Sequence, residues 1–545
     1  MTDSLVSLRG SNIAKLDRTA FDVLIVGGGI NGAVSAAALA GRGVRVALIE
    51  RADFAGATSQ ESSNLAWGGI KYLESMEFPL VRRLCVSRNH LMRRYPSTVQ
   101  EIRFYATVQR GFRWHPSVLY AGAWLYWLIG SGFTRTPRYL TPARIRAEEP
   151  VIDATDAVGG FEYSDAYLHD NDARFVFNFI RRALSSGCIG ANYVESLGAS
   201  HDPSGWVTRA RDVMTGREFE IRSSVLVNAA GPFVDAHNRL SDVATRHRHV
   251  LSKGVHLIVD RVTPRHRVLT FFASDGRLFF VIPMGPRTCI GTTDTRVDTP
   301  DASVTEADRA FVLDNANARL RLRRPLTTAD IIAERCGVRP LVTEARAPAG
   351  ADWMQLSRRH VIETNSALGL LSIFGGKLTD CLNVGDEVCD AVRDFGITIP
   401  SPAYRWHGEP PEEVRDEFFH QAVLMDLDGY TAADSSEPLS TRLWRRYGAN
   451  ALGLLEQIRE DPDDAEILIA GTEYIRCEIE QAARREMIVT LEDFLRRRSK
   501  IAQIARPDAI RAAPGLMDAC RVLFGDQART RFDAYVRRSE HPPHE

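Results

Sequence analysis

The stretch VGGGINGA, Val26–Ala33, decides how the chain begins to fold. It follows the apolar run Val23–Val26, which is typical of a buried parallel strand, and it places glycines 27, 29 and 32 at GxGxxG spacing. The first glycine permits a tight turn, the second lets a pyrophosphate approach the backbone, and the third lets helix and strand pack closely. The spacing therefore predicts a strand-to-helix turn that binds a doubly negative group.

A helix, a second strand and a terminal acid complete this pattern. Good helix formers occupy Ser35–Leu39, the chain turns at Gly41 and Gly43, and the strand Val44–Ile49 ends on Glu50. Together they make a βαβ unit of roughly 30 residues, as the dinucleotide fingerprint requires. Glu50 is placed to accept hydrogen bonds from ribose hydroxyls, and its charge would repel a 2′-phosphate. We predict a dinucleotide site that excludes NADP, against the simpler alternative of an ordinary βα turn.

Composition narrows the class of protein. The chain has 545 residues, enough for two or three buried cores, and its 44% hydrophobic and 25% charged residues are typical of a soluble globular protein. Lys plus Arg (68) nearly cancels Asp plus Glu (69), so nothing indicates nucleic acid. The 8 cysteines show no CxxC pair and no metal-ligand spacing. We therefore expect reduced thiols, no metal and, because no signal-peptide core stands at the N-terminus, a cytoplasmic location.

The uncharged stretch Val118–Phe133 most resembles a membrane segment. It falls short of the roughly 20 apolar residues that span a bilayer. The favoured prediction is a buried helix. The alternative is an interfacial helix, because Tyr120, Trp124, Tyr126 and Trp127 suit a membrane boundary.

The composition changes after a Pro-rich segment that begins near residue 400. Before it, short β-rich runs alternate with helices; after it, helical periodicity dominates, as in Glu478–Ile501. The predicted organisation is an N-terminal extension (1–20), an α/β region (21–400) with interleaved parts, a linker (401–411) and a C-terminal helical domain (412–545).

Two further clusters of small residues follow predicted strands. LVNAAG (Leu226–Gly231) ends a strand in small side chains, and SIFGGKLTD (Ser372–Asp380) follows an apolar run and opens a helix. A helix N-terminus favours an electron-rich group such as the N1/O2 edge of a flavin. Three separate places where a ligand can approach the backbone indicate a large, extended cofactor.

With these residues in view, the chain resembles the FAD-dependent glycerol-3-phosphate dehydrogenases of the D-amino-acid-oxidase-like flavoprotein superfamily. The matching blocks stand in the family's order from Asp22 to about Ala502: IVGGGINGA, ATSQESSNLAWGGIKYLE, GFEYSDAYLHDNDARFV, VNAAGPFVD, LSKGVHLIV, FFVIPMGPRTCIGTTDT, CGVRPLV, SIFGGKLTD and REMIVTLEDFLRRRSKIA. The resemblance implies an α/β fold, with a Rossmann-type FAD-binding domain interleaved with a β-sheet substrate domain, plus a C-terminal α-helical cap.

The resemblance also implies which residues bind FAD. They comprise the glycine turn and its acid, a loop after the second strand, and the two later clusters. These residues are Gly27, Gly29, Asn31, Gly32, Glu50, Thr58, Ser59, Ser63, Asn64, Ala230, Gly231, Gly376, Leu378 and Thr379.

The implied reaction is oxidation of sn-glycerol 3-phosphate to dihydroxyacetone phosphate, by hydride transfer from C2 to flavin N5, with the electrons passed to a quinone. Arg339 and Lys377 match family positions beside the flavin, where cations steady a developing oxyanion. His256 matches an active-site histidine and is the expected proton acceptor. Arg358 matches a phosphate-binding arginine, and Tyr72 is a candidate hydrogen-bond donor to substrate.

Three positions depart from the family's pattern. WGGIKYLE carries Trp67 where the family has a histidine and Lys71 where it has an arginine that binds phosphate, and Asp380 replaces a threonine or similar residue. Lysine keeps the charge but loses the bidentate fork. Lys71 is therefore expected to bind substrate, with a changed affinity or a changed preferred substrate.

Alternative functions follow from these departures. One is an oxidase that delivers electrons to O₂, and another is a dehydrogenase of a different phosphorylated polyol. A third, in a different class, is a non-catalytic flavin-binding sensor.

Partners are predicted less directly. The basic run FLRRRSK (Phe494–Lys500) is expected to be a solvated helix face within the cap, in preference to a nucleic-acid or lipid patch. The resemblance implies peripheral association with the inner face of the cell membrane, and it alone suggests a homodimer.

Overall fold

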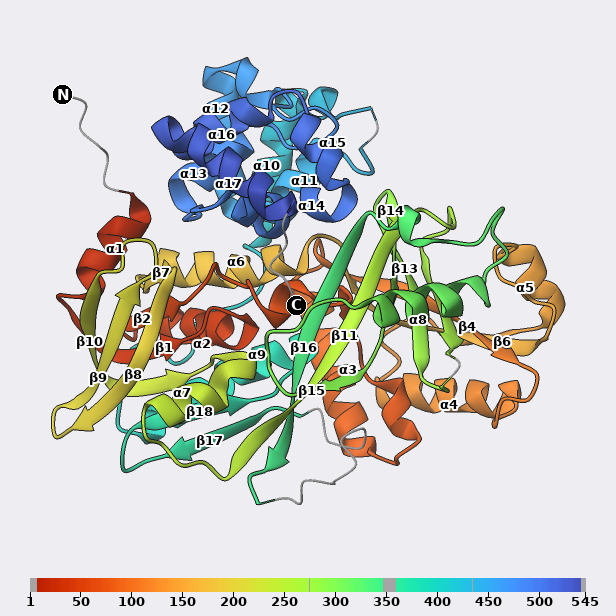
Figure 1. The fold of residues 1–545 in the computed structure, drawn as a ribbon, viewed down its shortest axis with the longest axis horizontal. Coiled ribbons are helices and arrows are strands. Elements are labelled where there is room, and N and C mark those ends of the chain that lie inside the picture. Colours follow the sequence, from red (N-terminus) through yellow and green to blue (C-terminus); the bar gives the residue numbers. More distant parts are fainter. Residues whose placement is uncertain (1–6, 274, 347–358, 434, 541–545) are drawn as a thin grey trace.

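The computed structural model describes residues 7–273, 275–346, 359–433 and 435–540. Two β-sheets lie side by side, and the C-terminal helices sit on top of them, over α6 (Asp172–Ser185) (Figure 1). This arrangement confirms the predicted α/β fold class, with a Rossmann-type sheet, a second sheet and a C-terminal helical region.

The first sheet is mainly parallel, in the order β17-β18-β10-β1-β2-β7, with the β8–β9 hairpin continuing from β10. Its strands are β1 (Ala20–Val26), β2 (Val46–Glu50), β7 (Ile189–Asn192), β8 (Val194–Asp202), β9 (Gly205–Asp212), β10 (Glu218–Asn228), β17 (Val361–Asn365) and β18 (Leu370–Phe374).

The second sheet runs β15-β11-β14-β13-β12-β4-β6-β3, with β16 on β11 and β5 on β6. Its strands are β3 (Leu65–Ala66), β4 (Val99–Gln109), β5 (Arg138–Leu140), β6 (Ala157–Leu168), β11 (His247–Asp260), β12 (Arg267–Phe272), β13 (Leu278–Met284), β14 (Arg287–Gly291), β15 (Thr295–Val297) and β16 (Ala333–Glu344).

The helices fall into two groups. Besides α6, those of the α/β region are α1 (Leu8–Leu16), α2 (Ile30–Gly41), α3 (Phe78–Arg94), α4 (Pro116–Ile129), α5 (Pro142–Glu148), α7 (Val234–Leu240), α8 (Glu306–Asn317) and α9 (Cys381–Asp394). Those of the C-terminal helical region are α10 (Glu412–Leu424), α11 (Leu439–Tyr447), α12 (Ala451–Glu460), α13 (Arg476–Arg485), α14 (Ile501–Ile504), α15 (Pro507–Ala512), α16 (Leu516–Phe524) and α17 (Ala528–Glu540).

The opening βαβ unit forms as the sequence predicts, with shifted ends. β1 starts at Ala20, before the predicted Val23, and β2 starts at Val46, after the predicted Val44. From Val23 to Val26 the strand is apolar because both of its faces are buried there. Val23 and Ile25 face the core shared with α2, while Leu24 and Val26 face the opposite core.

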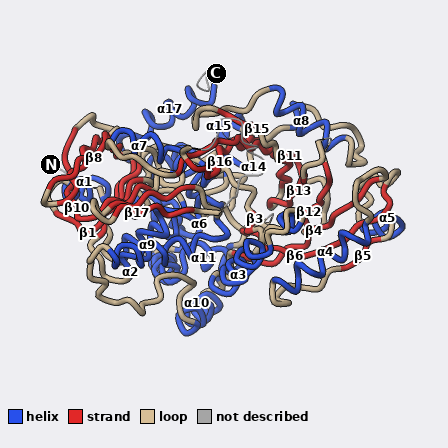
Figure 2. Tube along the Cα trace, turned by 90° about the horizontal axis from the view of Figure 1, so that it is seen from below, coloured by secondary structure: helices blue, strands red, loops and turns tan. Residues whose placement is uncertain are grey.

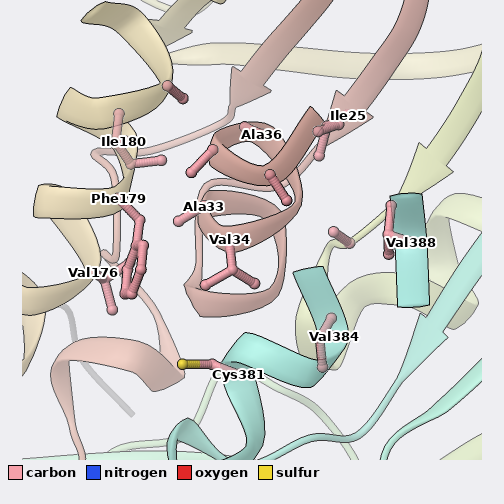
Figure 3. Packing of buried hydrophobic residues seen from close by; sticks show 14 of the residues in the cluster. Ile25, Ala33, Val34, Ala36, Val176, Phe179, Ile180, Cys381, Val384 and Val388 are labelled. Carbon is pink, nitrogen blue, oxygen red and sulfur yellow. The ribbon is translucent and has the colours of Figure 1, made fainter. Parts of the chain in front are cut away.

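Helix α2 packs unusually closely between its neighbours. Its alanines and Val34 lie between Phe179 and Ile180 of α6 and Val384 of α9 (Figure 3). Figure 2 shows α2, α6 and α9 on one side of the first sheet. Small side chains on α2 let both flanking helices approach, and the helix is held with its N-terminus at the end of β1.

Helix α4 corrects one expectation. The favoured prediction was a buried helix, but the buried residues of α4 are Pro116, Ala123 and Tyr126, while Val118, Leu125 and Leu128 are 52%, 41% and 62% exposed. Within the described ranges, no helix is both long and apolar enough to cross a bilayer.

The C-terminal helical region differs from its predicted pattern in two ways. The run Glu478–Ile501 is interrupted, because α13 ends at Arg485, Met487 has φ 51°, and a π-helical segment spans Asp493–Arg498. The predicted solvated face at Phe494–Lys500 is wrong, since its arginines are buried against acids of the α/β region. A single sequence does not show partners that are hundreds of residues away.

Gly32→Ala tests the contact between α2 and β1. A Cβ at Gly32 would stand 1.8 Å from the Gly27 carbonyl oxygen, and backbone cannot move aside cheaply. We expect a loss of about 3 kcal/mol or more in stability, seen as a lower thermal midpoint.

The matched control is Gly453→Ala in α12, where a Cβ meets open space. It should leave stability unchanged or raise it by about 0.5–1 kcal/mol. Equal midpoints for the two variants would contradict this view of the turn.

Candidate cofactor and active site

A long cavity lies at the carboxyl ends of β1, β2 and β10, where ligands bind in open α/β sheets. It contains about 1270 Å³ of space, part of it open to solvent. Its walls come from the glycine turn, the end of β2, the loop after β2, and the small residues after β10 and β18. They include Gly27, Gly29, Asn31, Glu50, Thr58, Ser59, Glu195, Ala230, Gly231, Pro340, Gly375 and Gly376.

The glycine turn has a conformation that side chains would block. Gly27 has φ +110°, and a Cβ there would lie 2.5 Å from the Ala229 carbonyl oxygen. Gly29 is the N-cap of α2, so the first amides of the helix point into the cavity. The Ile30 amide donates to Ser59 Oγ at 3.0 Å, which ties the loop after β2 to the helix start. The geometry suits an anionic ligand.

Glu50 organises the turn as well as bordering the cavity. Its carboxylate accepts hydrogen bonds from the Gly28 amide at 2.7 Å and from the Ala52 amide at 2.9 Å. Burial raises the pKa of Glu50, and the two amides act in the opposite direction. The acid therefore stands beside the cavity on a fixed backbone.

Asn31 presents an acceptor to the far end of the cavity. Its Nδ2 donates to the Gly375 carbonyl at 3.0 Å, while its buried Oδ1 has no hydrogen-bond partner in the described part of the chain. Gly376 has φ +114°, and a Cβ there would come within 3.1 Å of that oxygen. A ligand that carries an N–H or O–H group would satisfy the buried acceptor.

Other predicted cofactor residues lie outside the cavity wall. Gly32 packs on Gly27, and Leu378 packs partly on the core. Thr379 Oγ1 donates to the Trp67 carbonyl at 3.3 Å. Ser63 is half-buried within the loop between β2 and β3.

Asn64 is engaged entirely within the protein. Its Oδ1 accepts from Arg335 Nη1 at 2.6 Å, and its Nδ2 donates to the Asp170 carbonyl at 2.7 Å. In this structure Asn64 therefore stabilises the loop and makes its contacts away from the cavity.

The second sheet presents His256 and Arg339 on one face. Strand β11 pairs antiparallel with β16, with Ser252 opposite Arg339 and His256 opposite Arg335. Because side chains alternate along a strand, these residues share a face. His256 is 2% exposed, and neither ring nitrogen has a hydrogen-bond partner among the described residues. Burial, with Arg339 and Arg335 nearby, lowers the pKa of His256 well below its usual value.

Arg339 lies over the backbone of β11 because Gly254 leaves room for it. A Cβ at Gly254 would stand 2.0 Å from Arg339 Nη2. The guanidinium donates to Thr292 Oγ1 at 2.9 Å. The next residue, Pro340, lines the cavity together with Gly376, whereas Arg339 itself is not among the lining residues.

Lys377 follows Gly376, which lines the cavity, and its side chain contacts Tyr72. Lys377 Nζ donates to the Tyr72 hydroxyl at 2.7 Å and lies 4.3 Å from the ring centroid. Trp67 packs against Tyr72 and Phe280, with ring centroids 6.2 Å and 6.4 Å apart. Since Gly291 of β14 pairs with both Phe280 and His256, these aromatic residues adjoin the histidine.

Lys71 is not brought into this group. Its side chain is exposed and lines a separate, mainly apolar groove with Leu73, Trp114, Val118 and Phe272. The predicted phosphate ligand Arg358 lies outside the described residues.

Asp380 serves the structure around α3 and α9. It accepts from Ser87 Oγ at 2.8 Å and pairs with His360 Nδ1 at 3.0 Å.

Arg335 is a site residue that the sequence reasoning missed. It is fully buried beside His256 and binds Asn64, the Ser62 carbonyl and Gln503. The signal was present, because Arg335 and Arg339 are four positions apart on one strand and must share its face.

Comparisons with known proteins agree with this geometry. A family described as FAD dependent oxidoreductase matches residues 22–381, and one described as the C-terminal domain of alpha-glycerophosphate oxidase matches residues 419–531. Glycerol-3-phosphate dehydrogenase 2 of Mycobacterium tuberculosis is 31% identical over 90% of this chain and 82% of that protein. The human mitochondrial glycerol-3-phosphate dehydrogenase is 31% identical over 70% of this chain and 54% of that protein.

Solved structures share the fold. The glycerol-3-phosphate dehydrogenase from Bacillus halodurans, complexed with FAD, has a TM-score of 0.74 at 23% identity and covers 99% of this chain and 100% of its own. The L-alpha-glycerophosphate oxidase from Mycoplasma pneumoniae, with FAD bound, has a TM-score of 0.54 at 16% identity and covers 72% of this chain and 99% of its own.

Glu50→Gln tests the cofactor end of the cavity. The amide keeps the shape of the side chain but turns an NH₂ toward one of the two backbone donors. Because charge-assisted hydrogen bonds are about twice as strong as neutral ones, we expect the Kd for FAD to rise about tenfold or more. Quenching of flavin fluorescence measures it.

Glu195→Gln is the matched control, since Glu195 lines the same cavity but pairs with Arg211 at the surface. It should change the Kd by less than about twofold. An unchanged Kd for FAD in Glu50→Gln would show that Glu50 does not contribute to cofactor binding.

Proposed function

Because the chain belongs to the FAD-dependent oxidoreductase family and, within it, to the glycerol-3-phosphate dehydrogenases, we propose that it oxidises sn-glycerol 3-phosphate to dihydroxyacetone phosphate. One observation carries the proposal. Pro340 and Gly376 line the cofactor cavity, and each has a cation as its neighbour in the chain, Arg339 and Lys377. Removal of a hydride and a proton from a secondary alcohol needs cations at that place.

The cavity residues fit FAD. Gly27, Gly29 and the amides of α2 would face its pyrophosphate, Glu50 its ribose, and the orphaned Asn31 Oδ1 a donor at its other end. When bound, FAD supplies a two-electron acceptor that takes a hydride from carbon. The proposed contacts also include Thr58, Ser59, Ala230, Gly231 and Gly376. The other predicted cofactor residues lie outside the cavity wall, namely Gly32, Ser63, Asn64, Leu378 and Thr379.

His256 is proposed to take the hydroxyl proton. Burial keeps its imidazole neutral, so a ring nitrogen is available as an acceptor at neutral pH. A base must be unprotonated to act, and a lowered pKa keeps it unprotonated to below pH 6.5. Arg339 and Lys377 then stabilise the negative charge that develops on the substrate oxygen, and Tyr72 holds Lys377 in place.

The substrate phosphate is the less constrained part of the proposal. Arg358 is its proposed partner. Lys71 would have to turn from the outer groove to reach it, and Trp67 fills space beside Tyr72. These two positions favour keeping another phosphorylated polyol as a second candidate substrate.

Anaerobic titration of the holoprotein tests the reaction. Glycerol 3-phosphate should bleach the flavin absorbance stoichiometrically. If only another phosphopolyol bleached the flavin, that compound would be identified as the substrate. If none of them did, a non-catalytic flavin sensor would be favoured. In air, peroxide released in step with turnover would identify an oxidase.

Gly254→Ala tests Arg339 without removing its charge. The new methyl group displaces the guanidinium, so the rate constant for flavin reduction should fall about 100- to 1,000-fold, as when an oxyanion donor is lost. Stopped-flow absorbance measures this rate. Gly453→Ala, in the C-terminal helical region, is the control and should reduce the flavin at the normal rate. A normal rate in Gly254→Ala would contradict the role of Arg339.

We propose that a membrane quinone accepts the electrons and that α4 lies against the membrane. Exposed apolar side chains gather on α4 and the start of α3, namely Val118, Leu125, Leu128 and Phe78, with Trp114 beside them. Such a patch, with an aromatic residue at its border, suits a lipid surface. The groove that Lys71 lines opens within this patch, since Trp114 and Val118 also line it. From the resemblance to the family, we also propose that the protein is cytoplasmic and forms a homodimer.

Leu125→Glu with Leu128→Glu tests the membrane face. Both side chains are exposed, so the double variant should fold and reduce flavin normally, yet bind vesicles of anionic phospholipid at least about tenfold more weakly in co-sedimentation. Val423→Glu with Leu424→Glu, a still more exposed apolar pair on α10, is the control and should bind normally. The opposite result would move the membrane face to the C-terminal helices.

A further inference from the structure

The basic run Arg496–Arg498 extends from the C-terminal helical region into the α/β region. The three side chains belong to the π-helical segment Asp493–Arg498 and are 8%, 6% and 2% exposed. Buried cations need partners, because an unpaired charge in the interior is costly. All three find acids on one loop of the α/β region.

That loop, residues 51–64, connects β2 with β3. Two of the arginines share Asp53. Arg498 donates from both terminal nitrogens to the two Asp53 oxygens at 2.8 Å, and Arg497 Nε donates to Oδ2 at 2.6 Å. Burial alone would raise the pKa of Asp53, but Arg498 and Arg497 lower it.

The third arginine holds the other end of the loop. Arg496 Nη2 donates to Glu61 Oε2 at 2.8 Å, and Arg497 Nη1 reaches Gln60 Oε1 at 3.2 Å. The arginines therefore hold both ends of the segment Asp53–Glu61.

This segment lies between the arginines and the cofactor cavity. Gly56, Ala57, Thr58 and Ser59 line the cavity, and Ala55 is a buried residue with φ 63°. A left-handed conformation at a non-glycine residue costs energy and persists only where the surroundings enforce it. The loop therefore needs support from outside itself.

On the cavity side, the same segment is joined to α2 and to the second sheet. Ser59 Oγ accepts from the Ile30 amide of α2 at 3.0 Å, and Thr58 Oγ1 donates to the Val338 carbonyl of β16 at 2.7 Å. A shift of the loop would move the wall of the cavity and the start of α2 together.

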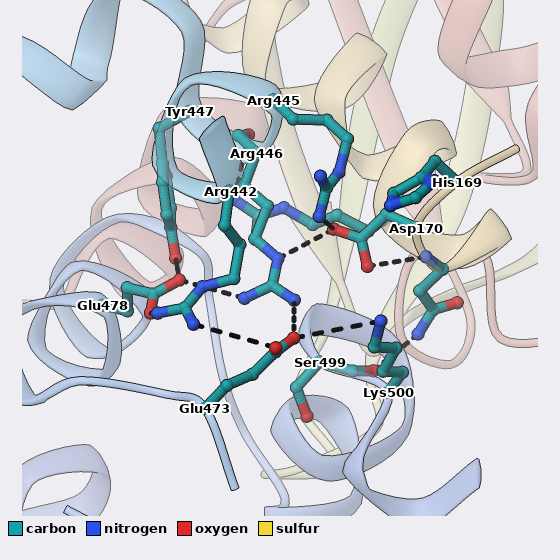
Figure 4. Close-up of polar contacts among 12 residues, drawn as sticks. His169, Asp170, Arg442, Arg445, Arg446, Tyr447, Glu473, Glu478, Ser499 and Lys500 are labelled. Carbon is teal, nitrogen blue, oxygen red and sulfur yellow. Dashed lines mark hydrogen bonds and ion pairs between the residues drawn. The ribbon is translucent and has the colours of Figure 1, made fainter. Parts of the chain in front are cut away.

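A second buried ion network fastens the C-terminal helical region nearby (Figure 4). Arg446 Nε donates to Asp170 Oδ2 at 2.7 Å, and the Asp170 carbonyl accepts from Asn64 at the end of the loop. Burial acts to raise the pKa of Glu473, but Arg446, Lys500 and Arg442 lower it to about 2. Of these contacts, the pair Arg446–Asp170 joins the C-terminal helical region to the α/β region.

We propose that Arg496, Arg497 and Arg498 are positioning residues for the cofactor, and that they hold the loop Asp53–Glu61 in its FAD-binding conformation. FAD binding and docking of the C-terminal helical region then strengthen each other by the same factor, because coupling between two sites is reciprocal. The inference rests on the proposal that Thr58 and Ser59 border bound FAD.

Arg498→Gln and Arg498→Lys test the positioning role. Glutamine removes the charge and the fork, whereas lysine keeps the charge. We expect the Kd for FAD to rise about 10- to 100-fold with glutamine and less with lysine, as for residues that orient the direct contacts of a ligand. Glu61→Gln, at a less buried pair, provides a milder variant.

Arg442→Gln is the matched control. Arg442 is as buried as Arg498 and pairs with Glu478 at 2.7 Å, entirely within the C-terminal helical region. It should lower the thermal midpoint of the apoprotein as Arg498→Gln does, but change the Kd for FAD by less than about threefold. A rise in Kd as large as that in Arg498→Gln would show that FAD affinity follows general stability, and would overturn the proposal.

Hydrogen exchange of the apo- and holoprotein measures the coupling without any variant. FAD should slow amide exchange in the glycine turn Gly27–Gly32 and also in Asp493–Gln503. Protection of the turn with no change in Asp493–Gln503 would overturn the coupling alone. Protection of neither would instead refute the placement of FAD, so the two failures are distinguishable.

Discussion

The close contact between the start of α2 and the end of β1 is the constraint on which the rest of the structure depends. Gly32 lies against the Gly27 carbonyl with no room for a side chain. Only this approach brings the first amides of α2 to the carboxyl edge of the sheet, where they line the cavity. The alanines of α2 extend the same principle, since they let α6 and α9 pack on both sides of the helix.

From this contact the site is assembled by three separate parts of the fold. The first sheet supplies the glycine turn and Glu50, and the second sheet supplies His256 and Arg339 on one face. The C-terminal helical region adds no residue to the cavity wall among those described, yet its arginines hold the loop that forms part of that wall. The proposed cofactor site and the proposed reactive residues come together where β16, β18 and the loop after β2 converge.

Local features were predictable from the sequence, and distant ones were not. The β1–α2–β2 unit was predicted because its spacing, apolar runs and glycines act within one stretch of chain. The burial of Arg496 and Arg497 was not, because their partners Glu61 and Asp53 are 435 and 444 positions away. The exposed face of α4 was covered only by the alternative prediction of an interfacial helix, because apolar residues lie on both faces of this helix. The outward direction of Lys71 depends on packing around Tyr72, which the motif WGGIKYLE does not show.

The central claim is that this cavity places the C2 hydrogen of a phosphorylated alcohol against bound FAD. The most direct measurement is the rate of anaerobic flavin reduction by glycerol 3-phosphate that carries deuterium at C2, compared with the unlabelled compound. The account predicts a primary isotope effect of several-fold on the flavin-reduction step, because the C2–H bond breaks in that step. If the two compounds reduced the flavin at equal rates when hydride transfer limits that rate, the account would be contradicted.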